Sequence, residues 1–354
     1  MSASSSPPTV LVTGGSGFIG SYVILALLSA GYTVRSTIRS LSREASARSS
    51  LRNGGATTAE LARLSFVAAS LDYDDGWVQA IQGCKYVHHV ASPFPAELPK
   101  HEDDLIITAH EGTLRVLRAA AAGGVERVVL TSSFGAVGYG HAPRKTPFTE
   151  EDWTTLDGKH AKISPYMKSK TIAERAAWEF INSEKNSSKM ELSVVIPLMV
   201  AGPVLGKDIS TSIQVIKKLM DGSMPGCPNI YFTYVDVRDI ASLHLLAMTT
   251  PEAAGQRFLA GGNDPAISML EVGKIIKAKR PQNAKKVPSI QIPNFVVHAL
   301  AIFDKPIRQI LPELGKVVQA SNQKARESFG WQPRSVEESV LDAADSLVKY
   351  GVVG

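Results

Sequence analysis

A run of glycines close to the start of this chain constrains its fold more than any other feature. The run Thr13-Gly-Gly-Ser-Gly-Phe-Ile-Gly20 follows a predicted buried strand, Thr9–Thr13, and opens a predicted helix, Phe18–Ala30. In such a unit the glycines permit the tight turn, the approach of a pyrophosphate to the backbone, and close packing of helix on sheet. Free N–H groups at the helix N-terminus then hold the phosphates. A tight turn without a ligand is the alternative, but the context predicts a dinucleotide-binding loop of Gly14, Ser16, Gly17, Phe18, Ile19 and Gly20.

The first half of the chain alternates apolar β-type runs with helical stretches. Further strands are predicted over Tyr32–Ile38, Leu64–Ala69, Tyr86–Ala91, Arg127–Ser132 and Leu192–Ile196, and long helices over Asp104–Ala122 and Tyr166–Ser183. Strands separated by helices form a parallel sheet with helices on both faces. We therefore predict an α/β fold, a doubly wound Rossmann sheet with a smaller C-terminal substrate-binding lobe.

The pattern loosens after Pro197, where proline and glycine become frequent, and Tyr231–Ala247 is predicted to return to the main sheet. We expect a disordered tail over residues 1–8. A nucleotide-binding Rossmann domain is predicted over 9–196 plus about 230–250, and the substrate-binding lobe over 197–229 plus about 251–354.

The residues after the second predicted strand distinguish between the two nicotinamide coenzymes. NAD-binding proteins usually place an acidic side chain there to bind the ribose hydroxyls. Here the strand runs into Ile38-Arg39-Ser40, and the first acidic residue that follows is Glu44. A guanidinium is a bidentate partner for a 2′-phosphate, Ser40 can donate a hydrogen bond, and Arg43 lies one turn further. Solvated surface charges are the alternative, but these positions favour NADP(H) over NAD(H), with Arg35 a weaker candidate.

A tyrosine and a lysine four residues apart open the predicted helix Tyr166–Ser183. Tyr166 and Lys170 share one helix face. A free tyrosine has a pKa of about 10, and a neighbouring ammonium lowers it. The hydroxyls of Thr131-Ser132-Ser133 end the fifth predicted strand, where one of them can hold a carbonyl oxygen against the tyrosine. A surface Tyr/Lys pair is the alternative, but the three motifs in this order predict a catalytic site.

Together these residues resemble the extended short-chain dehydrogenase/reductase family, and within it the dihydroflavonol 4-reductase-like group. That group includes plant flavonoid and cinnamoyl-CoA reductases and the ketone and aldehyde reductases of fungi and yeasts. The resemblance covers nearly the whole chain. It is carried by Val10–Gly20, Val34–Arg39, Val87–Phe94, Gly112–Ala119, Val128–Ser133, Tyr166–Lys170, Pro197–Pro203, Tyr234–Asp239 and Ser321–Trp331 with Pro333.

The resemblance implies a role for each matching residue. Ser133 is the serine that holds the carbonyl oxygen and Tyr166 the proton donor. Lys170 orients the coenzyme and lowers the pKa of the tyrosine, and Arg39 binds the 2′-phosphate. The further coenzyme contacts predicted are Ser70, Leu71, Val90, Ala91, Ser92, Thr131, Ser132, Pro197, Met199, Val200 and Ser212.

Two departures from the family pattern affect the predicted site. The acidic residue that often contacts the adenine is replaced by Ser70, and Asp72, two residues later, is the possible substitute. No asparagine stands between Asn53 and Asn182, so the proton-relay asparagine of many family members has no counterpart. A water molecule or a backbone carbonyl would have to take its place.

Apolar residues flank the predicted chemistry and suit an aromatic or branched ketone or aldehyde. The substrate pocket is predicted to be lined by Phe94, Phe134, Met167, Met199 and Leu205, although for each residue alone a core position is the better prediction. The segment Asp236-Val-Arg-Asp239 is predicted to be a structural ion-pair element near the coenzyme.

Composition narrows the possible partners. The net charge is +5, but Lys and Arg are spread along the chain, so a pocket for a phosphorylated coenzyme is preferred to a nucleic-acid surface. The two cysteines, Cys84 and Cys227, show no metal-ligand or disulfide spacing, and no metal is expected. The apolar runs are too short for a bilayer and the N-terminus does not resemble a signal peptide. We expect a cytoplasmic protein without membrane partners, monomeric or homodimeric.

These patterns predict an NADP(H)-dependent oxidoreductase that reduces a small-molecule ketone or aldehyde to an alcohol. The alternatives on the same fold are a nucleotide-sugar epimerase or dehydratase and a hydroxysteroid dehydrogenase. A non-catalytic NADP-sensing protein is the alternative from a different class, and it has no need of all three of Ser133, Tyr166 and Lys170.

Overall fold

The structure, a computed structural model, describes residues 7–93 and 101–354. The predicted tail therefore lies outside the described residues except for Pro7 and Pro8, which are exposed. The chain forms two compact units, each built from three segments. The first unit comprises the described residues of Met1–Tyr139 with Ile163–Ile196 and Ile240–Phe258, and the second comprises Gly140–Lys162, Pro197–Asp239 and Leu259–Gly354.

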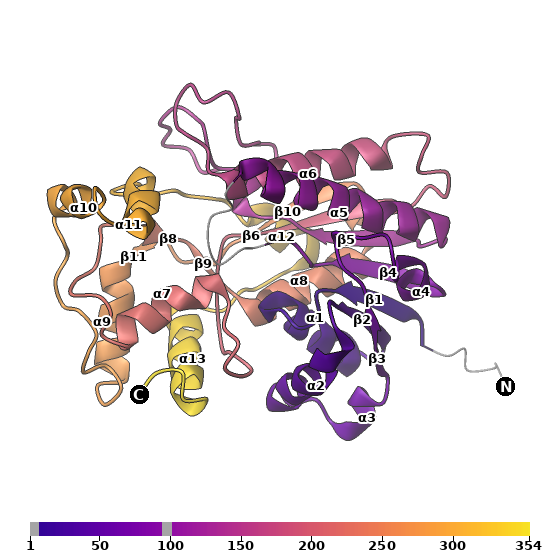
Figure 1. The fold of residues 1–354 in the computed structure, drawn as a ribbon, viewed down its shortest axis with the longest axis horizontal. Coiled ribbons are helices and arrows are strands. Elements are labelled where there is room, and N and C mark those ends of the chain that lie inside the picture. Colours follow the sequence, from indigo (N-terminus) through magenta and orange to yellow (C-terminus); the bar gives the residue numbers. More distant parts are fainter. Residues whose placement is uncertain (1–6, 94–100) are drawn as a thin grey trace. The chain divides into compact units, whose positions relative to one another are not determined.

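The central sheet has seven strands in the order β10-β6-β5-β4-β1-β2-β3 (Figure 1). The pairs from β3 across to β6 are parallel, and the strands β1, β5 and β6 carry buried apolar runs at their centres. This confirms the predicted doubly wound sheet, since a parallel sheet covered on both faces needs such runs. Its strands are β1 (Thr9–Thr13), β2 (Thr33–Ile38), β3 (Leu64–Ala68), β4 (Cys84–His89), β5 (Arg127–Thr131), β6 (Glu191–Pro197) and β10 (Gln256–Ala260).

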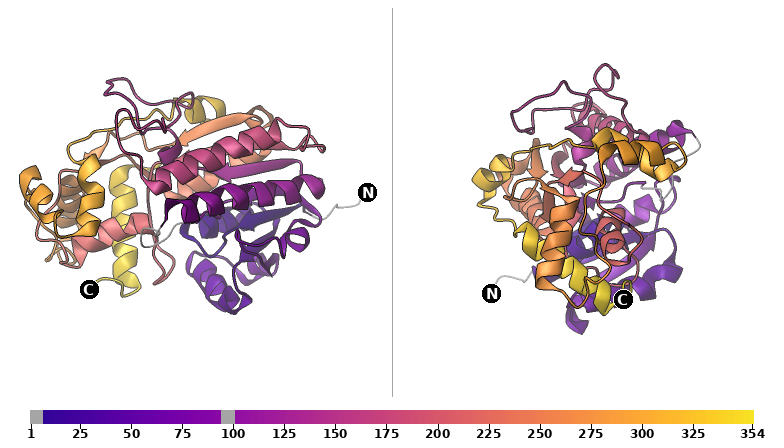
Figure 2. Two further views of the ribbon diagram at one scale, coloured as in Figure 1. Left: turned by 45° about the horizontal axis from the view of Figure 1, so that its top comes forward. Right: turned by 90° about the vertical axis from the view of Figure 1, so that its left-hand side faces the viewer.

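Helices cover both faces of the sheet. Figures 1 and 2 show α5 and α6 side by side along one face. Successive residues of a strand point to opposite faces, and β4 shows this: His88 contacts His244 of α8, whereas His89 lies within the electrostatic influence of Lys170 on α6. These helices are α1 (Phe18–Ser29), α2 (Glu44–Asn53), α3 (Thr58–Leu61), α4 (Trp77–Ile81), α5 (Glu102–Ala122), α6 (Pro165–Ile181) and α8 (Val237–Thr249).

The strand order reverses between β1 and β4. In open parallel sheets, ligands bind beyond the carboxyl ends of the strands at such a switch point. Thr13 ends β1 and His89 ends β4, and their side chains are hydrogen-bonded, Thr13 Oγ1 to His89 Nδ1, at 2.9 Å. The glycine loop follows Thr13, so the topology places it at the switch point.

The prediction that Tyr231–Ala247 rejoins the main sheet is wrong for its strands. The strand β8 (Tyr231–Phe232) pairs with β11 (Ile267–Ser268), and β9 (Tyr234–Asp236) pairs with β7 (Met199–Ala201), in two separate small sheets. The seventh strand of the main sheet is β10. The strand is hard to predict because it begins with the polar residues Gln256-Arg257. A buried arginine is tolerated only with an ionic partner, and the local sequence does not show one.

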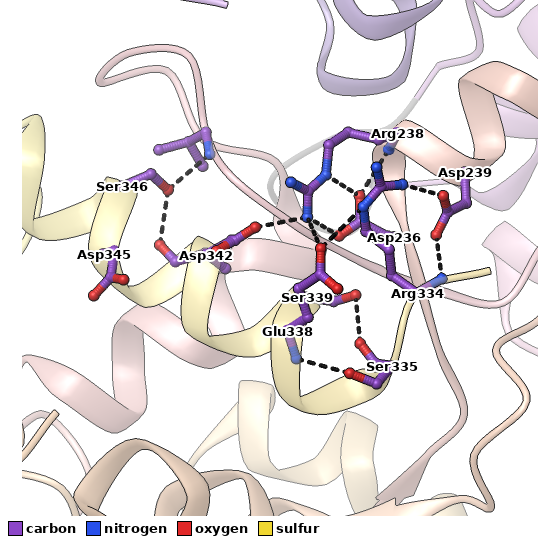
Figure 3. A network of polar contacts seen from close by, with 12 residues as sticks. Asp236, Arg238, Asp239, Arg334, Ser335, Glu338, Ser339, Asp342, Asp345 and Ser346 are labelled. Atoms are coloured by element: carbon purple, nitrogen blue, oxygen red, sulfur yellow. Dashed lines mark hydrogen bonds and ion pairs between the residues drawn. The ribbon is translucent and has the colours of Figure 1, made fainter. Parts of the chain in front are cut away.

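The second unit contains α7 (Thr211–Met220), α9 (Met269–Lys279), α10 (Asn294–Leu300), α11 (Lys305–Ile310), α12 (Gln323–Phe329) and α13 (Val336–Lys349). Figure 3 shows the ion-pair network that connects β9 to α13. Asp236 is fully buried and accepts two hydrogen bonds from the Arg238 guanidinium, both 2.8 Å long. Arg238 also pairs with Asp342 at 2.7 Å, and Arg334 pairs with Asp239. The ion-pair character predicted for Asp236–Asp239 is thus confirmed.

None of the helices in the part of the chain that the structure describes is long and apolar enough to cross a membrane. Within residues 7–93 and 101–354, no group of three or more His, Cys, Asp or Glu side chains is placed to hold a metal ion.

Candidate active site

The glycine loop has the geometry that a pyrophosphate requires. Gly14 has a φ of +71°, and a Cβ there would lie 3.0 Å from the Cα of Ala91. A Cβ on Gly20 would lie 2.4 Å from the Gly14 carbonyl oxygen, so neither position accepts a side chain without a shift. Helix α1 begins after Gly17 with no side-chain cap and no acidic residue in its first turn. Its first N–H groups therefore suit an anion, and the loop fits a dinucleotide.

The arginines after and within β2 have different surroundings. Arg39 is exposed, and among the described residues its guanidinium has no hydrogen-bond or ion-pair partner. Arg35, the weaker candidate, instead donates hydrogen bonds to the backbone oxygens of Ala80 and Gln82, at 2.9 and 2.7 Å. A guanidinium so engaged is a structural group, whereas Arg39 is available for a phosphate.

The two serines predicted near the adenosine half begin local turns. Ser40 caps the short 3-10 helix Leu41–Arg43, accepting a hydrogen bond from the Ser42 N–H at 3.3 Å. Ser70 follows β3 and donates to the Asp72 carboxylate at 2.9 Å. The two candidates for the adenine contact are therefore hydrogen-bonded to each other. Leu71, the next residue, packs close to Gly112 of α5.

Ser133 and Tyr166 meet at the carboxyl edge of the sheet. Ser133 follows β5 and caps the 3-10 helix η2 (Phe134–Ala136), and Tyr166 lies in the first turn of α6, where Ser164 is the N-cap and Pro165 the first residue. Both starts use residues that favour helix N-termini. The two side chains share a hydrogen bond. The structure thus brings together the predicted oxygen-holding group and the predicted proton donor.

The pKa of Tyr166 is raised above its ordinary value by burial, and the hydrogen bond with Ser133 acts in the opposite direction. The expected lowering by Lys170 is not seen, because removal of the phenolate from water outweighs the other influences. Tyr166 as a whole keeps partial solvent exposure. Its raised pKa keeps the hydroxyl protonated at neutral pH.

Lys170 lies one turn beyond Tyr166 and is 7% exposed. Its ammonium donates to the Thr131 carbonyl oxygen at 3.4 Å. Burial lowers the pKa of Lys170 to about 8, and the nearby Glu174 carboxylate opposes this shift. Lys170 remains mostly charged at neutral pH and lies beside the end of β5.

The residues after β4 are held close to the glycine loop. The Ala91 N–H donates to Thr13 Oγ1 at 2.9 Å, and the same hydroxyl bonds to His89. Val90, Ala91 and Ser92 are partly exposed. This segment therefore lies beside the glycine loop, and its contact with the coenzyme stays a prediction.

The predicted pocket residues are distributed unevenly. Phe134 and Met167 both lie next to Ser133. Phe134 is the following residue. Gly135 donates its N–H to Ser133 Oγ at 3.1 Å, and Met167 lies close to the same glycine. Phe94 lies outside the described residues. Pro197, Met199, Val200, Leu205 and Ser212 belong to the second unit, where Met199 and Val200 form β7 and Ser212 lies in the first turn of α7.

Two charged residues, one on α6 and one on β10, were not singled out by the sequence prediction. Glu174 of α6 and Arg257 of β10 form an ion pair with an Nε–Oε1 distance of 2.6 Å, and their side chains are 1% and 9% exposed. Glu174 is also hydrogen-bonded to Ser132. The available signal was its position, four residues after Lys170 on the face that carries Tyr166.

Three histidines in this unit are buried without charge. Burial lowers the pKa of His89 to about 3, with Lys170 adding to the shift, and burial lowers the pKa of His244 to about 3 as well. The pKa of His88 is also far below its ordinary value because of burial and the neighbouring His244. These imidazoles stay neutral at physiological pH and act as hydrogen-bonding groups.

Stability should fall as the solution is acidified from about pH 6.5. In the unfolded chain these histidines take up protons below a pKa of about 6.5. In the folded chain His89 and His244 take up protons only near pH 3. The free energy of unfolding therefore decreases across this interval. Urea unfolding at pH 7.5, 6.5, 5.5 and 5.0 measures the slope of the free energy of unfolding against pH. These pH values lie above the ordinary pKa range of carboxyl groups.

The variant His244→Gln should show a smaller slope, because one buried titrating group is gone. His160→Gln removes an exposed histidine and serves as the control, with the wild-type slope expected. A slope in His244→Gln equal to that of the wild type would show that this imidazole does take up a proton while folded.

The comparisons with known proteins agree with this geometry. The NAD dependent epimerase/dehydratase family matches residues 10–261, more than half of the chain. A cinnamoyl-CoA reductase of Medicago truncatula is 33% identical, covering 98% of each chain, and a ketoreductase of Aspergillus niger is 31% identical, covering 96% of this chain and 97% of its own. The chain therefore belongs to the NAD dependent epimerase/dehydratase family.

A solved structure also resembles this one over nearly its whole length. The yeast methylglyoxal/isovaleraldehyde reductase Gre2, complexed with NADPH, superposes with a TM-score of 0.80 at 27% identity, covering 97% of this chain and 99% of its own. These relatives match the reductase branch that the sequence resembles, so both the predicted family and the predicted fold class are confirmed.

Proposed function

We propose that this protein is an NADPH-dependent reductase that converts a ketone or an aldehyde to an alcohol. The observation that carries the proposal is the hydrogen bond between Ser133 and Tyr166, with Lys170 one turn further, beside the glycine loop. The oxidoreductase class and the NADP(H) coenzyme agree with the relatives, which are named as reductases, and with Gre2, which was solved with NADPH.

The residues of the first unit divide the coenzyme-binding task. The glycine loop and the start of α1 would hold the pyrophosphate, and Arg39 with Ser40 and Arg43 would hold the 2′-phosphate. Lys170 would hold the ribose next to the nicotinamide. When bound, the reduced nicotinamide supplies the hydride that adds to the carbonyl carbon.

The chain itself would manage the proton. Ser133 donates a hydrogen bond to the carbonyl oxygen and fixes it near Tyr166, whose hydroxyl gives its proton to that oxygen as negative charge develops there. Burial raises the pKa of Tyr166, so its hydroxyl keeps the proton until negative charge develops on the carbonyl oxygen. The Lys170 ammonium then stabilises the phenolate that is left. Phe134 and Met167 supply apolar surface beside Ser133.

The test is NADPH oxidation by the purified protein against aromatic, aliphatic and dicarbonyl compounds, with NADH in parallel. Turnover that prefers NADPH supports the reductase, with the product alcohol identified by chromatography. Tight NAD retained through purification, or binding of NADPH without turnover of any carbonyl, would instead favour the sugar-nucleotide or the sensing alternatives.

The substitution Arg39→Ala should remove the preference for NADPH. A charge-assisted hydrogen bond contributes roughly 1.5–3 kcal/mol, so kcat/KM for NADPH should fall by about 10–100-fold. The value for NADH should stay within about twofold, because NADH has no 2′-phosphate. Arg52→Ala removes the same charge from an exposed position of α2 and should leave both values unchanged. Equal losses for the two coenzymes would place Arg39 away from the 2′-phosphate.

A further inference from the structure

The catalytic face of α6 continues one turn beyond Lys170 to a buried acidic residue. Tyr166, Lys170 and Glu174 are spaced by four residues and therefore share a face of the helix. Glu174 is 1% exposed, which is rare for a carboxylate unless it is paired. No step proposed above uses it.

Glu174 is held by contacts from three elements. Its Oε2 accepts a hydrogen bond from Ser132 of the segment after β5. Its Oε1 accepts from Arg257 Nε of β10 at 2.6 Å and from Trp178 Nε1 of α6 at 3.4 Å. Ser132 directly precedes Ser133, so one carboxylate connects the backbone that carries Ser133 to the helix that carries Tyr166 and Lys170.

The groups around Lys170 leave Glu174 as its counter-charge. From β4, His89 is neutral, and from β5 the Thr131 carbonyl accepts the ammonium hydrogen bond. From α5, Glu102 is paired with Lys168 at 2.8 Å. Arg257 of β10 faces Glu174 and shares its charge.

We infer that Glu174 is a positioning residue of the active site, which holds the Lys170 ammonium in its charged form and fixes the Ser132–Ser133 backbone against α6. It touches neither substrate nor coenzyme and acts through these neighbours. The inference rests on the proposed function for its catalytic consequence. Its electrostatic part concerns the protein alone and can be measured without turnover.

The decisive measurement is the titration of Lys170 in the whole protein. Lysine labelled with ¹³C at Cε gives one NMR signal per side chain, and Lys170→Arg assigns the signal of interest. In Glu174→Gln the midpoint of Lys170 should move to lower pH by on the order of one unit. Glu174→Asp keeps the charge and should hold the midpoint near that of the wild type. Glu179→Gln, an exposed position on the same helix, should leave it unchanged.

Activity supplies the second readout. In Glu174→Gln the alkaline limb of the kcat–pH profile should move down with the Lys170 midpoint, whereas a purely structural role would lower kcat equally at all pH values. Arg257→Met removes the arginine partner of the Glu174 carboxylate. It should therefore move both the Lys170 midpoint and the alkaline limb of the kcat–pH profile to higher pH. Should that variant not fold, the Gln and Asp variants of Glu174 still decide the question.

The outcomes separate the two ideas. An unchanged Lys170 midpoint in Glu174→Gln overturns the inference, even if the wild type reduces carbonyl compounds. A shifted midpoint in a protein that reduces no carbonyl compound upholds the role of Glu174 toward Lys170 and counts against the proposed function. A shifted midpoint with an unshifted kcat profile overturns the catalytic consequence alone.

Discussion

Replacing Tyr166 with phenylalanine is expected to lower kcat for carbonyl reduction by about 10²–10⁴-fold, the usual contribution of a general acid. The phenyl ring keeps the packing of the first turn of α6 but has no proton to give and no hydrogen bond to share with Ser133. Binding of NADPH and the unfolding midpoint should change little. The measurement is the loss of NADPH absorbance at saturating coenzyme, together with coenzyme fluorescence for binding.

The exposed Tyr73, 68% accessible, offers the same chemical change away from buried surroundings. Tyr73→Phe should keep the wild-type kcat. A Tyr166→Phe enzyme that loses less than about tenfold in kcat would exclude this tyrosine as the proton donor. The proposed mechanism would then need another acid, because the other hydroxyl placed at the site, that of Ser133, is assigned to hold the oxygen.

The substitution Arg238→Met should produce a large loss of stability at a place remote in the sequence from Ser133, Tyr166 and Lys170. It leaves the fully buried Asp236 carboxylate without its two guanidinium hydrogen bonds and also frees Asp342 (Figure 3). Breaking a buried ion pair from one side costs about 3–5 kcal/mol, and the lower end applies because Arg238 is 27% exposed. Urea unfolding followed by tryptophan fluorescence measures the change.

A matched pair on the surface of the same unit provides the control. Arg280 bonds to both oxygens of Asp345 at 2.7 Å, but both side chains are well exposed. Arg280→Met should cost far less than Arg238→Met, since exposed pairs contribute little. Equal losses in the two variants would mean that the burial of Asp236 does not determine the strength of the network.

The parts of the molecule that follow from local pattern were predictable from the sequence. The positive φ of Gly14 is a local requirement of its tight turn, and Tyr166 and Lys170 are related by one helical turn. The six strands from β1 to β6 appear where their apolar runs stand, to within about two residues. In each case the interacting residues are close in the sequence, so the pattern contains the information.

The parts that the sequence did not reveal depend on partners far along the chain. Arg257 is buried in the edge strand β10 because it pairs with Glu174, 83 residues earlier, and neither residue's sequence neighbourhood indicates the other. The same applies to the pKa of Tyr166: the spacing to Lys170 predicted a lowering, but burial by surrounding elements raises it. Desolvation depends on the assembled structure and has no local signature.

The alternation of the two units along the chain has a consequence for the order of folding during synthesis. Strand β6 ends at Pro197 and its neighbour β10 begins at Gln256, so about sixty residues of intervening chain leave the ribosome between them. Until then β6 is an open edge, of the kind that invites pairing with other chains. The Glu174 carboxylate also lacks its ionic partner until Arg257 has been synthesised, so its burial before that point would be unfavourable. The nascent chain is therefore expected to depend on chaperones most heavily after β6 and before β10 has been synthesised. Helix α6 is expected to reach its final packing late.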